Sequence, residues 1–505
     1  MGGQVASLAS VGAVMTDSSL SFATPRQGAQ GLAARVGGRV SAWVFGVVTG
    51  ATGILPPRLR YGYVHRVTRV LLNTPLPALR ALDAAPRSTS AARVTRAGEL
   101  TCAIGVGALD IGGIGSVVEL LAARLPARGI TPAVVCLGAG ARAQRIRDLG
   151  IEVRSVSDRA SALRVFDELR PDVIQLHGAP DFLEVAAMAS GAPLVPVLHN
   201  TEIHYSPARW RRFSQLVGES SSAVAVSELV RTFHAAHVPE PLRSRITVIP
   251  NAAPGRRAPN TQQRRVARGH LEAAVGGQFH DDVVFVCLAR YDAQKNIAGT
   301  VASFLSCVGA GVPAQLVIAG EPSDWVEFRR ADSIRRGSRD ADRVHLLATS
   351  DARTLLAAAD AFVLNSFFEG WPVAATEAWS AGLPLILSDV GGARELVARD
   401  PGRCVLIANA SGAPSAVTDR RVERARWRAT HQRNSSELGD AIRYVVDRVH
   451  CERAVPVAPL EASDGVDAMV EAHARLLRDA RTSRTEDSIR PGRVSGDGSR
   501  EAVRI

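Results

Sequence analysis

The chain has 505 residues, of which 46% are hydrophobic and 22% are charged, so it is long enough for two or three domains with large cores. Its net charge is +11, but residues 1–97 alone hold eleven arginines and two aspartates, a net charge of +9. The rest of the chain is close to neutral, which argues against a nucleic-acid groove in the main body. The six cysteines have neither metal-site nor redox spacing, which predicts reduced core residues in a cytoplasmic protein.

Residues 1–97 form a basic N-terminal extension. Residues 40–57 carry no charge, but a stretch of eighteen residues with several glycines is marginal for a membrane span. Residues 58–72 place apolar side chains at helical spacing among arginines, which predicts a basic helix lying on an anionic membrane surface. The alternative is an extension that packs on the main body.

Residues 98–250 alternate apolar runs with helical segments, as a parallel α/β domain does. The loop 108–115 contains Gly112 and Gly113 and leads into a helix predicted over 116–125; such loops bind phosphate through backbone N–H groups. The second strand is not followed by the acidic residue that binds ribose in dinucleotide-binding folds. Strands are predicted at 100–106, 132–137, 171–177, 194–199, 223–226 and 246–250, with Ser227 capping a helix over 228–234.

Residues 251–450 repeat this alternation and form a second predicted domain, which the polar residues 251–277 connect to the first. Residues 409–436 are rich in arginine and serine and are predicted to be an insertion. Residues 481–505 are predicted to be a disordered tail. Strands are predicted at 283–288, 315–319, 344–347, 361–365 and 385–387, and helices at 350–359, 372–381, 437–448 and 465–478.

Two carboxylates, Glu369 and Glu377, lie in one strand–loop–helix–strand unit with seven residues between them. Glu369 follows the carboxyl end of a strand, where open α/β sheets bind their ligands, and Glu377 falls in the second turn of the next helix. An ionised carboxylate only accepts hydrogen bonds and a hydroxyl donates them, so this pair suits a ligand rich in hydroxyls. The alternative is that both acids are solvated surface groups.

Arg290 and Lys295 follow the first strand of the second domain and lie at the same rim as Glu369. Lys295 is the only lysine among 60 cationic residues, which indicates a need for a compact ammonium group. Two cations at this rim can stabilise a departing diphosphate without a metal ion, although the alternative is an ordinary surface pair. No acidic, histidine or cysteine cluster has metal-ligand spacing, so no metal site is expected.

The stretch FFEGWPVAATEAWSAGLPLILSDVGGARELV, residues 367–397, resembles the Glu-x7-Glu signature of the family 4 retaining glycosyltransferases. The resemblance covers residues 98–480 and implies the GT-B fold, in which two Rossmann-like, doubly wound domains face each other across a cleft. The last helix, within residues 451–480, is then expected to cross back onto the first domain. Two positions depart from the family pattern: Ala348 replaces a glycine, and Ala252 follows Asn251 where glycine is common.

The resemblance implies an enzyme that moves a sugar from a UDP- or GDP-type nucleotide sugar to a glycan, lipid-linked or small-molecule acceptor, with no cofactor. Such enzymes build cell-surface polysaccharides and glycolipids, here in the cytoplasm or on the inner face of the membrane. By resemblance, Arg290 and Lys295 hold the donor diphosphate, and His199 orients the sugar, unless it is a structural histidine at a strand end; His177 is a weaker candidate. The implied catalytic residues are Glu369, Arg290, Lys295 and His199, and the implied donor-binding residues are Gly112, Gly113, Glu377, Gly370 and Trp371.

Three rival functions stay open. One is another GT-B enzyme, such as a sugar-nucleotide epimerase or a glucan or disaccharide synthase. A second is a nicotinamide-dependent oxidoreductase that uses the loop at Gly112, which the missing ribose-binding acid opposes. The third is a noncatalytic GT-B scaffold, which the intact charged residues oppose.

Overall fold

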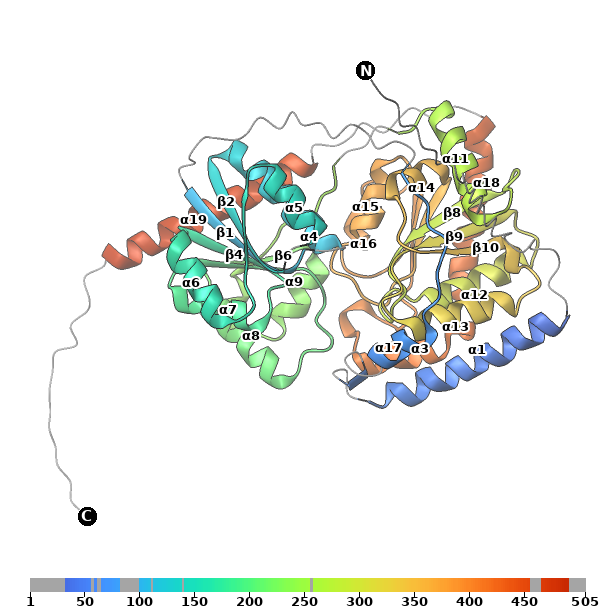
Figure 1. The fold of residues 1–505 in the computed structure, drawn as a ribbon, viewed down its shortest axis with the longest axis horizontal. Helices are drawn as coiled ribbons and strands as arrows, with labels where there is room; N and C mark the ends of the chain where they lie inside the picture. The colour runs from blue at the N-terminus through green and yellow to red at the C-terminus, as the bar shows by residue number, and fades with distance from the viewer. Residues whose placement is uncertain are drawn as a thin grey trace, which may run out of the picture.

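The computed structural model describes residues 32–55, 59–60, 65–81, 100–109, 112–138, 140–254, 258–454 and 465–489. These residues form two α/β domains, each built on a parallel sheet with helices packed on it (Figure 1). A parallel sheet that is covered on both faces needs apolar strands, and β4 (Val173–His177) and β9 (Ala314–Ala319) are buried at every position. The predicted fold class, with two Rossmann-like domains, is confirmed.

The first sheet has seven strands in the order β3-β2-β1-β4-β5-β6-β7. The order reverses between β1 and β4, so the connections after these strands leave toward opposite faces and open a crevice at the carboxyl edge. The other strands are β1 (Leu100–Ala108), β2 (Ile130–Leu137), β3 (Glu152–Ser155), β5 (Leu194–Leu198), β6 (Ala223–Ala225) and β7 (Ile246–Val248). The edge strand β3 was not predicted, because its four residues are largely polar.

The helices of the first domain begin at capping residues that the sequence largely supplies. Ser227 accepts a hydrogen bond from the backbone N of Val230 at 3.3 Å, as predicted for the start of α9 (Glu228–Ala235). α4 (Gly113–Arg124) begins three residues before its predicted start, because Gly112 itself takes the capping position. The remaining helices are α5 (Ala141–Asp148), α6 (Arg159–Leu169), α7 (Asp181–Ser190), α8 (Pro207–Glu219) and α10 (Glu240–Arg243).

The second sheet has six strands in the order β10-β9-β8-β11-β12-β13, which reverses between β8 and β11. Its strands besides β9 are β8 (Val283–Leu288), β10 (Val344–Leu347), β11 (Ala361–Leu364), β12 (Leu385–Ser388) and β13 (Cys404–Ile407). Its helices are α11 (Thr261–Val275), α12 (Ile297–Val308), α13 (Trp325–Arg336), α14 (Ala352–Ala358), α15 (Val373–Ser380), α16 (Ala393–Val397), α17 (Asp419–Trp427) and α18 (Ser435–Ala454). The long helix α19 (Gly465–Ile489) returns to the first domain and buries Met469, Val470, Ala474 and Leu477 in its core.

Several stretches differ from their predictions. Residues 409–436 are not a loose insertion, because they contain α17, whose Val422 and Ala425 pack on Phe367 and Phe368. The tail predicted from residue 481 is helical up to Ile489, since no glycine or proline interrupts α19 there; residues 490–505 lie outside the described chain. Five cysteines are buried, but Cys451 is exposed, so one was wrongly assigned to a core.

The N-terminal extension packs on the second domain. Its helix α1 (Leu32–Gly53) lies along α13, and the shorter α3 (His65–Leu72) lies nearby (Figure 1). The backbones of α1 and of the end of α13 approach closely, because a Cβ at Gly38 would lie 2.5 Å from the backbone N of Gly337. Within the described ranges, no helix combines the length and hydropathy that crossing a bilayer requires. Helix α1 therefore packs on the main body, which is the alternative that the sequence left open.

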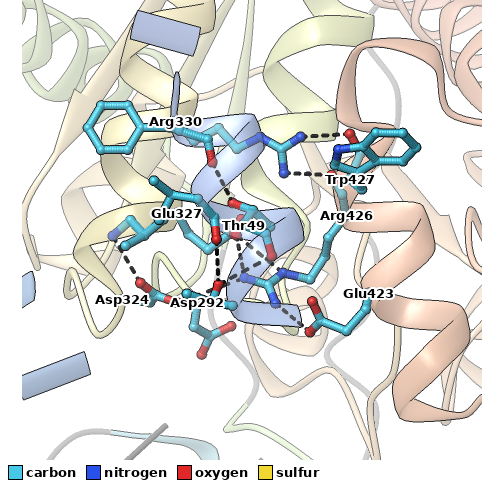
Figure 2. A network of polar contacts seen from close by, with 12 residues as sticks. Thr49, Asp292, Asp324, Glu327, Arg330, Glu423, Arg426 and Trp427 are labelled. Atoms are coloured by element: carbon cyan, nitrogen blue, oxygen red, sulfur yellow. Dashed lines mark hydrogen bonds and ion pairs between the residues drawn. The ribbon is translucent and has the colours of Figure 1, made fainter. Parts of the chain in front are cut away.

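A buried network of charges ties α1 to the second domain (Figure 2). Arg426 of α17 is 3% exposed and donates to Glu327 of α13 at 2.6 Å and to Glu423 at 2.5 Å. Arg60 also pairs with Glu423, at 2.6 Å, and donates to the carbonyl oxygens of Gly53 and Leu55 at the end of α1. Because a buried charge without a partner is strongly destabilising, these contacts hold α1 in place.

Candidate active site

The charged residues predicted for the site come from the two loops at the reversal point of the second sheet. β8 and β11 are paired neighbours, and the loop after β8 carries Arg290 and Lys295 while the loop after β11 carries Glu369. The carboxyl ends of parallel strands meet at one edge, so strand order alone brings these loops together.

Lys295 and Glu369 form a direct ion pair. The Nζ atom of Lys295 lies 2.5 Å from Oε1 of Glu369, and the two side chains are 16% and 7% exposed. Ser366 donates to the same carboxylate oxygen at 2.7 Å, and Gln294 donates to the other oxygen at 3.2 Å. A buried carboxylate needs such partners, and here they fix its orientation. Sequence reasoning missed Ser366 and Gln294, whose only signal is their position beside the two charged residues.

The loop after β8 turns Lys295 inward and leaves Arg290 near the surface. Asp292 accepts hydrogen bonds from the backbone N atoms of Gln294 and Lys295 at 3.0 and 3.1 Å. The other oxygen of Asp292 lies 3.0 Å from Nη2 of Arg290, whose side chain is 46% exposed. Tyr291 is fully buried, and its hydroxyl lies 2.8 Å from the carbonyl oxygens of two neighbouring strands, so the loop is anchored to the sheet. Both predicted cations thus have acidic partners.

Gly370 lies where the two domains touch. A Cβ on this residue would lie 1.7 Å from the backbone carbonyl oxygen of His199, so only glycine permits this approach. Trp371 is 4% exposed and packs in the core of the first domain, with its indole donating to Thr376 at 2.8 Å. Among the described residues, no group accepts a hydrogen bond from the backbone N of Gly370 or Trp371. Their donation of hydrogen bonds to a ligand stays a prediction.

The glycine loop of the first domain faces the same contact. A Cβ at Gly113 would lie 3.3 Å from Cγ2 of Val373, at the start of the helix that carries Glu377. Gly112 has φ 142°, a conformation that side chains disfavour, and it caps α4, whose N-terminus is suited to bind an anion. Glu377 lies in the second turn of α15, as predicted.

His199 follows β5 and lies next to this domain contact through its carbonyl oxygen. Its Nε2 lies 2.9 Å from Nδ1 of His177, at the end of β4. Burial lowers the pKa of His199 to about 3 and the pKa of His177 well below its usual value, so both rings are neutral at pH 7. His177 is thus a buried partner of His199.

A cavity of about 410 Å³ separates the two domains on one side of this contact. Its lining includes Glu202, Trp210, Phe233 and His237 of the first domain and residues 415–418 of the second. Burial raises the pKa of Glu202 to about 7. Sequence reasoning missed this cavity, because its aromatic residues come from separate helices.

No metal cluster occurs in the described part of the chain, where no group of three or more histidine, cysteine, aspartate or glutamate side chains could hold an ion. The absence of a metal requirement stays a prediction.

Two family models match the chain, and each covers one of the two domains. Glycosyltransferase Family 4 matches residues 111–254, and Glycosyl transferases group 1 matches residues 282–423. The chain belongs to glycosyltransferase family 4. Both loops at the reversal point of the second sheet lie within the second match, and His199 and Gly113 lie within the first.

Curated relatives of this family 4 protein have related activities. The chain is 28% identical over 259 residues to a GDP-mannose:cellobiosyl-diphosphopolyprenol alpha-mannosyltransferase of Xanthomonas oryzae, covering 48% of this chain and 63% of the relative. It is 30% identical over 250 residues to a glycogen synthase of Mycobacterium tuberculosis, covering 45% and 54% respectively. The chain thus spans less than two thirds of the length of these relatives.

Solved structures share the fold of this family 4 protein at low identity. Anabaena HepE in complex with UDP and glucose is 17% identical with a TM-score of 0.56, covering 77% of this chain and 99% of HepE. The catalytic domain of starch synthase IV from Arabidopsis thaliana is 14% identical with a TM-score of 0.53, covering 76% and 99%. These proteins share the two-domain architecture of this chain.

Proposed function

We propose that this family 4 protein transfers a sugar from a nucleotide diphosphate sugar to an acceptor hydroxyl with retained anomeric configuration. The observation that carries this proposal is the buried Lys295–Glu369 pair at the reversal point of the second sheet, next to the contact between Gly370 and His199. One member of the pair suits a diphosphate and the other suits a sugar hydroxyl.

When the donor binds, the contact between Lys295 and Glu369 breaks, and each of the two residues contacts the donor instead. Its diphosphate takes the ammonium group of Lys295 and the guanidinium group of Arg290, and Glu369 then accepts a hydrogen bond from a hydroxyl of the transferred sugar. Glu377 accepts from the ribose, and the backbone N–H groups of Gly112, Gly113, Gly370 and Trp371 donate to donor oxygens. Cations fixed in advance stabilise the charge that develops on the leaving phosphate.

Retention follows from attack on the face that the diphosphate leaves. Glu369 keeps the hydrogen bonds from Ser366 and Gln294 after Lys295 has turned to the diphosphate, so it serves as an acceptor of hydrogen bonds rather than as a nucleophile. The bond from the sugar to the acceptor oxygen forms as the bond to the phosphate breaks, and the acceptor proton passes to the leaving phosphate oxygen. Catalysis then rests on positioning and on charge stabilisation as the domains close.

We further propose a UDP or GDP donor and a glycan or lipid-linked acceptor, in the synthesis of a cell-surface polysaccharide or glycolipid. UDP is bound in the HepE structure, and the Xanthomonas relative is named for GDP-mannose and a diphosphopolyprenol acceptor. We assign the cavity beside Glu202 to the acceptor, because most of its lining comes from the first domain. The alternative is a glucan synthase, which the glycogen synthase relative favours.

A screen of nucleotide sugars tests the donor. One UDP- or GDP-sugar should raise the unfolding temperature, because a ligand at 100 times its Kd stabilises the folded state by about 2.7 kcal/mol. The same donor should then yield nucleotide and a glycosylated acceptor at a rate that EDTA does not change. Nucleotide release without transfer to any acceptor, or tight binding of NAD instead, would contradict the proposal; transfer only from an ADP-sugar to glucan would support the alternative.

The outer face of the N-terminal extension is unusually apolar. Eleven of the fourteen exposed large hydrophobic side chains in the described chain lie within residues 32–71. The side of α1 that packs on the protein carries Gly38 and Thr49, whereas Val36, Val40 and Val44 are exposed and do not line the cavity between α1 and the second domain. The described residues from 32 to 81 include six arginines and no acidic residue. We propose that this face rests on an anionic membrane surface on the cytoplasmic side, with α1 rather than residues 58–72 as its main contact.

Point substitutions test this membrane contact better than deletion, because removing the extension would strip Arg60 from Glu423. The triple variant Val36→Ser, Val40→Ser and Val44→Ser should bind anionic vesicles at least about a hundredfold more weakly, since each apolar side chain buried in the membrane contributes about 1.5–3 kcal/mol. Val266→Ser, an exposed valine on α11, is the matched control and should bind normally. Unchanged binding of the triple variant, or a dimer that forms through α1 in sedimentation, would contradict the proposal.

A further inference from the structure

A chain of hydrogen bonds leads from His199 into the interior of the first domain. Nε2 of His199 lies 2.9 Å from Nδ1 of His177, and Nε2 of His177 lies 2.9 Å from Oε1 of Gln175. The amide nitrogen of Gln175 lies 3.0 Å from Nδ1 of His473. The chain thus connects the domain contact at His199 to α19, the helix that returns from the second domain.

Three of these four side chains have no exposed surface. Gln175, His177 and His473 are each 0% exposed, and they lie among apolar residues of the sheet and of α19. Burying a polar group in such surroundings costs free energy that hydrogen bonds must offset. An apolar core would avoid this cost. The row of polar side chains formed by His199, His177, Gln175 and His473 ends at the cleft, so its presence indicates a function there.

The glutamine amide gives the row a direction, because it has one accepting end and one donating end. Its Oε1 accepts, so Nε2 of His177 carries a proton and Nδ1 of His177 accepts. Nε2 of His199 must then donate to that Nδ1 and carry the proton of the neutral ring. Nδ1 of His199 keeps its lone pair, and no group in the described part of the chain donates a hydrogen bond to it.

We propose that Gln175 is a positioning residue that, through His177, fixes His199 in the tautomer with an unprotonated Nδ1, so that His199 accepts a hydrogen bond from a substrate hydroxyl in the cleft. This inference rests on the proposed glycosyl transfer, in which the substrates are rich in hydroxyls. His473 fixes the far end of the amide, so the last helix of the chain contributes to the orientation.

The electrostatics of the row agree with neutral rings. Burial lowers the pKa of His199 to about 3 and of His473 to about 4, and it lowers the pKa of His177 well below its usual value. A protonated ring donates from both nitrogens, so adding a proton to His177 would break one of its two hydrogen bonds. Neutral rings keep the row intact at pH 7.

The variant Gln175→Leu tests the positioning role. It keeps a similar volume but frees His177 to take either tautomer, so kcat should fall by about 10- to 100-fold, as for other partners of ligand-orienting histidines, with less than about a twofold change in donor KM. Gln175→Glu should restore most of the activity, because a carboxyl oxygen still accepts from Nε2 of His177. Equal losses in both variants would overturn the proposal.

The matched control is Gln315→Leu on β9. Gln315 is 5% exposed, and it lies 2.9 Å from Nε2 of His345 and 2.9 Å from a carboxylate oxygen of Asp282, at the end of the second sheet away from the cleft. This variant loses a buried histidine partner of the same kind, so it should lower the unfolding temperature and leave kcat unchanged. If it lowered kcat as much as Gln175→Leu, the effect would be one of stability alone, and the proposal would fail.

Nitrogen-15 spectra of labelled histidines read the tautomer without substrate or turnover. His199, assigned from the signals lost in His199→Gln, should show a protonated Nε2 and an unprotonated Nδ1 in the wild type and a mixture in Gln175→Leu. A mixture in the wild type would overturn the proposal even if Gln175→Leu did not fold. Absence of glycosyl transfer would instead appear as no wild-type turnover with any donor, while these spectra still report on the row.

Discussion

Replacing Lys295 with methionine should lower kcat by about a hundred- to a thousandfold, the loss seen when one fixed donor to a developing negative charge is removed. The ammonium group is the only cation that contacts Glu369 among the described residues, and in the proposed mechanism its loss leaves the departing phosphate with Arg290 alone. Single-turnover kinetics with saturating donor should show the loss in the chemical step.

The same substitution should also destabilise the fold, because it leaves the carboxylate of Glu369 buried without its ionic partner. Removing one partner of a buried pair costs about 3–5 kcal/mol, whereas neutralising both costs much less. The double variant Lys295→Met with Glu369→Gln should therefore recover most of the unfolding temperature but none of the activity. If activity returned together with stability, the lysine would have only a structural role.

Lys295→Arg separates charge from shape. The chain uses arginine for its other 59 cationic residues, so arginine is the substitution that composition favours. An arginine side chain is longer than lysine and ends in a planar group, so from the loop after β8 it does not reproduce the 2.5 Å contact that Lys295 makes with Glu369 in the loop after β11. We expect kcat to stay at least about tenfold below wild type, and full activity would show that charge alone suffices.

Gly370→Ala should abolish the close approach of the two domains and reduce turnover by about a hundredfold or more. The added methyl group would lie 1.7 Å from the carbonyl oxygen of His199, so the backbone of one domain must withdraw. Glu369 then no longer lies against the loop of His199, and a site that closure assembles stays incomplete. Small-angle scattering should show a larger radius of gyration than for the wild type.

Gly269→Ala is the control for this substitution. Gly269 lies in α11, where an added Cβ meets no atom within 4 Å, so the variant should keep both activity and shape. Each domain of Gly370→Ala should remain folded, because the clash lies between the domains. An active, compact Gly370→Ala protein would contradict the domain contact described for this loop.

The sequence predicted the elements of the site but not how they pair. Alternating strands and helices predict a parallel sheet whose strands all end at one edge, so Lys295 and Glu369 were expected at one rim. Their direct contact was not expected, since it depends on a tight turn at Asp292 and on a fully buried Tyr291. A short motif shows which types of side chain are present, whereas the contact between Lys295 and Glu369 depends on the conformation of the whole loop.

Long-range contacts left no local signal. Gln175 and His473 are 298 residues apart, and neither lies in a motif that would mark a polar row. Helix α1 was not predicted, because residues 40–57 stood out only as an uncharged stretch and helical spacing was noted for residues 58–72 instead. Only the close approach of Gly38 to Gly337 shows that the small residues face inward and the large apolar residues outward.

The charge network around Arg426 determines which half of the molecule can move. It joins the end of α1, through Arg60 and Glu423, to Glu327 of α13. Asp324, the capping residue of α13, donates its backbone N to the carbonyl oxygen of Tyr291 in the loop that presents Lys295. A membrane that holds α1 would therefore immobilise the donor half. Opening and closing would then move the first domain, with the part of the cavity wall that carries Glu202, toward and away from a stationary second domain.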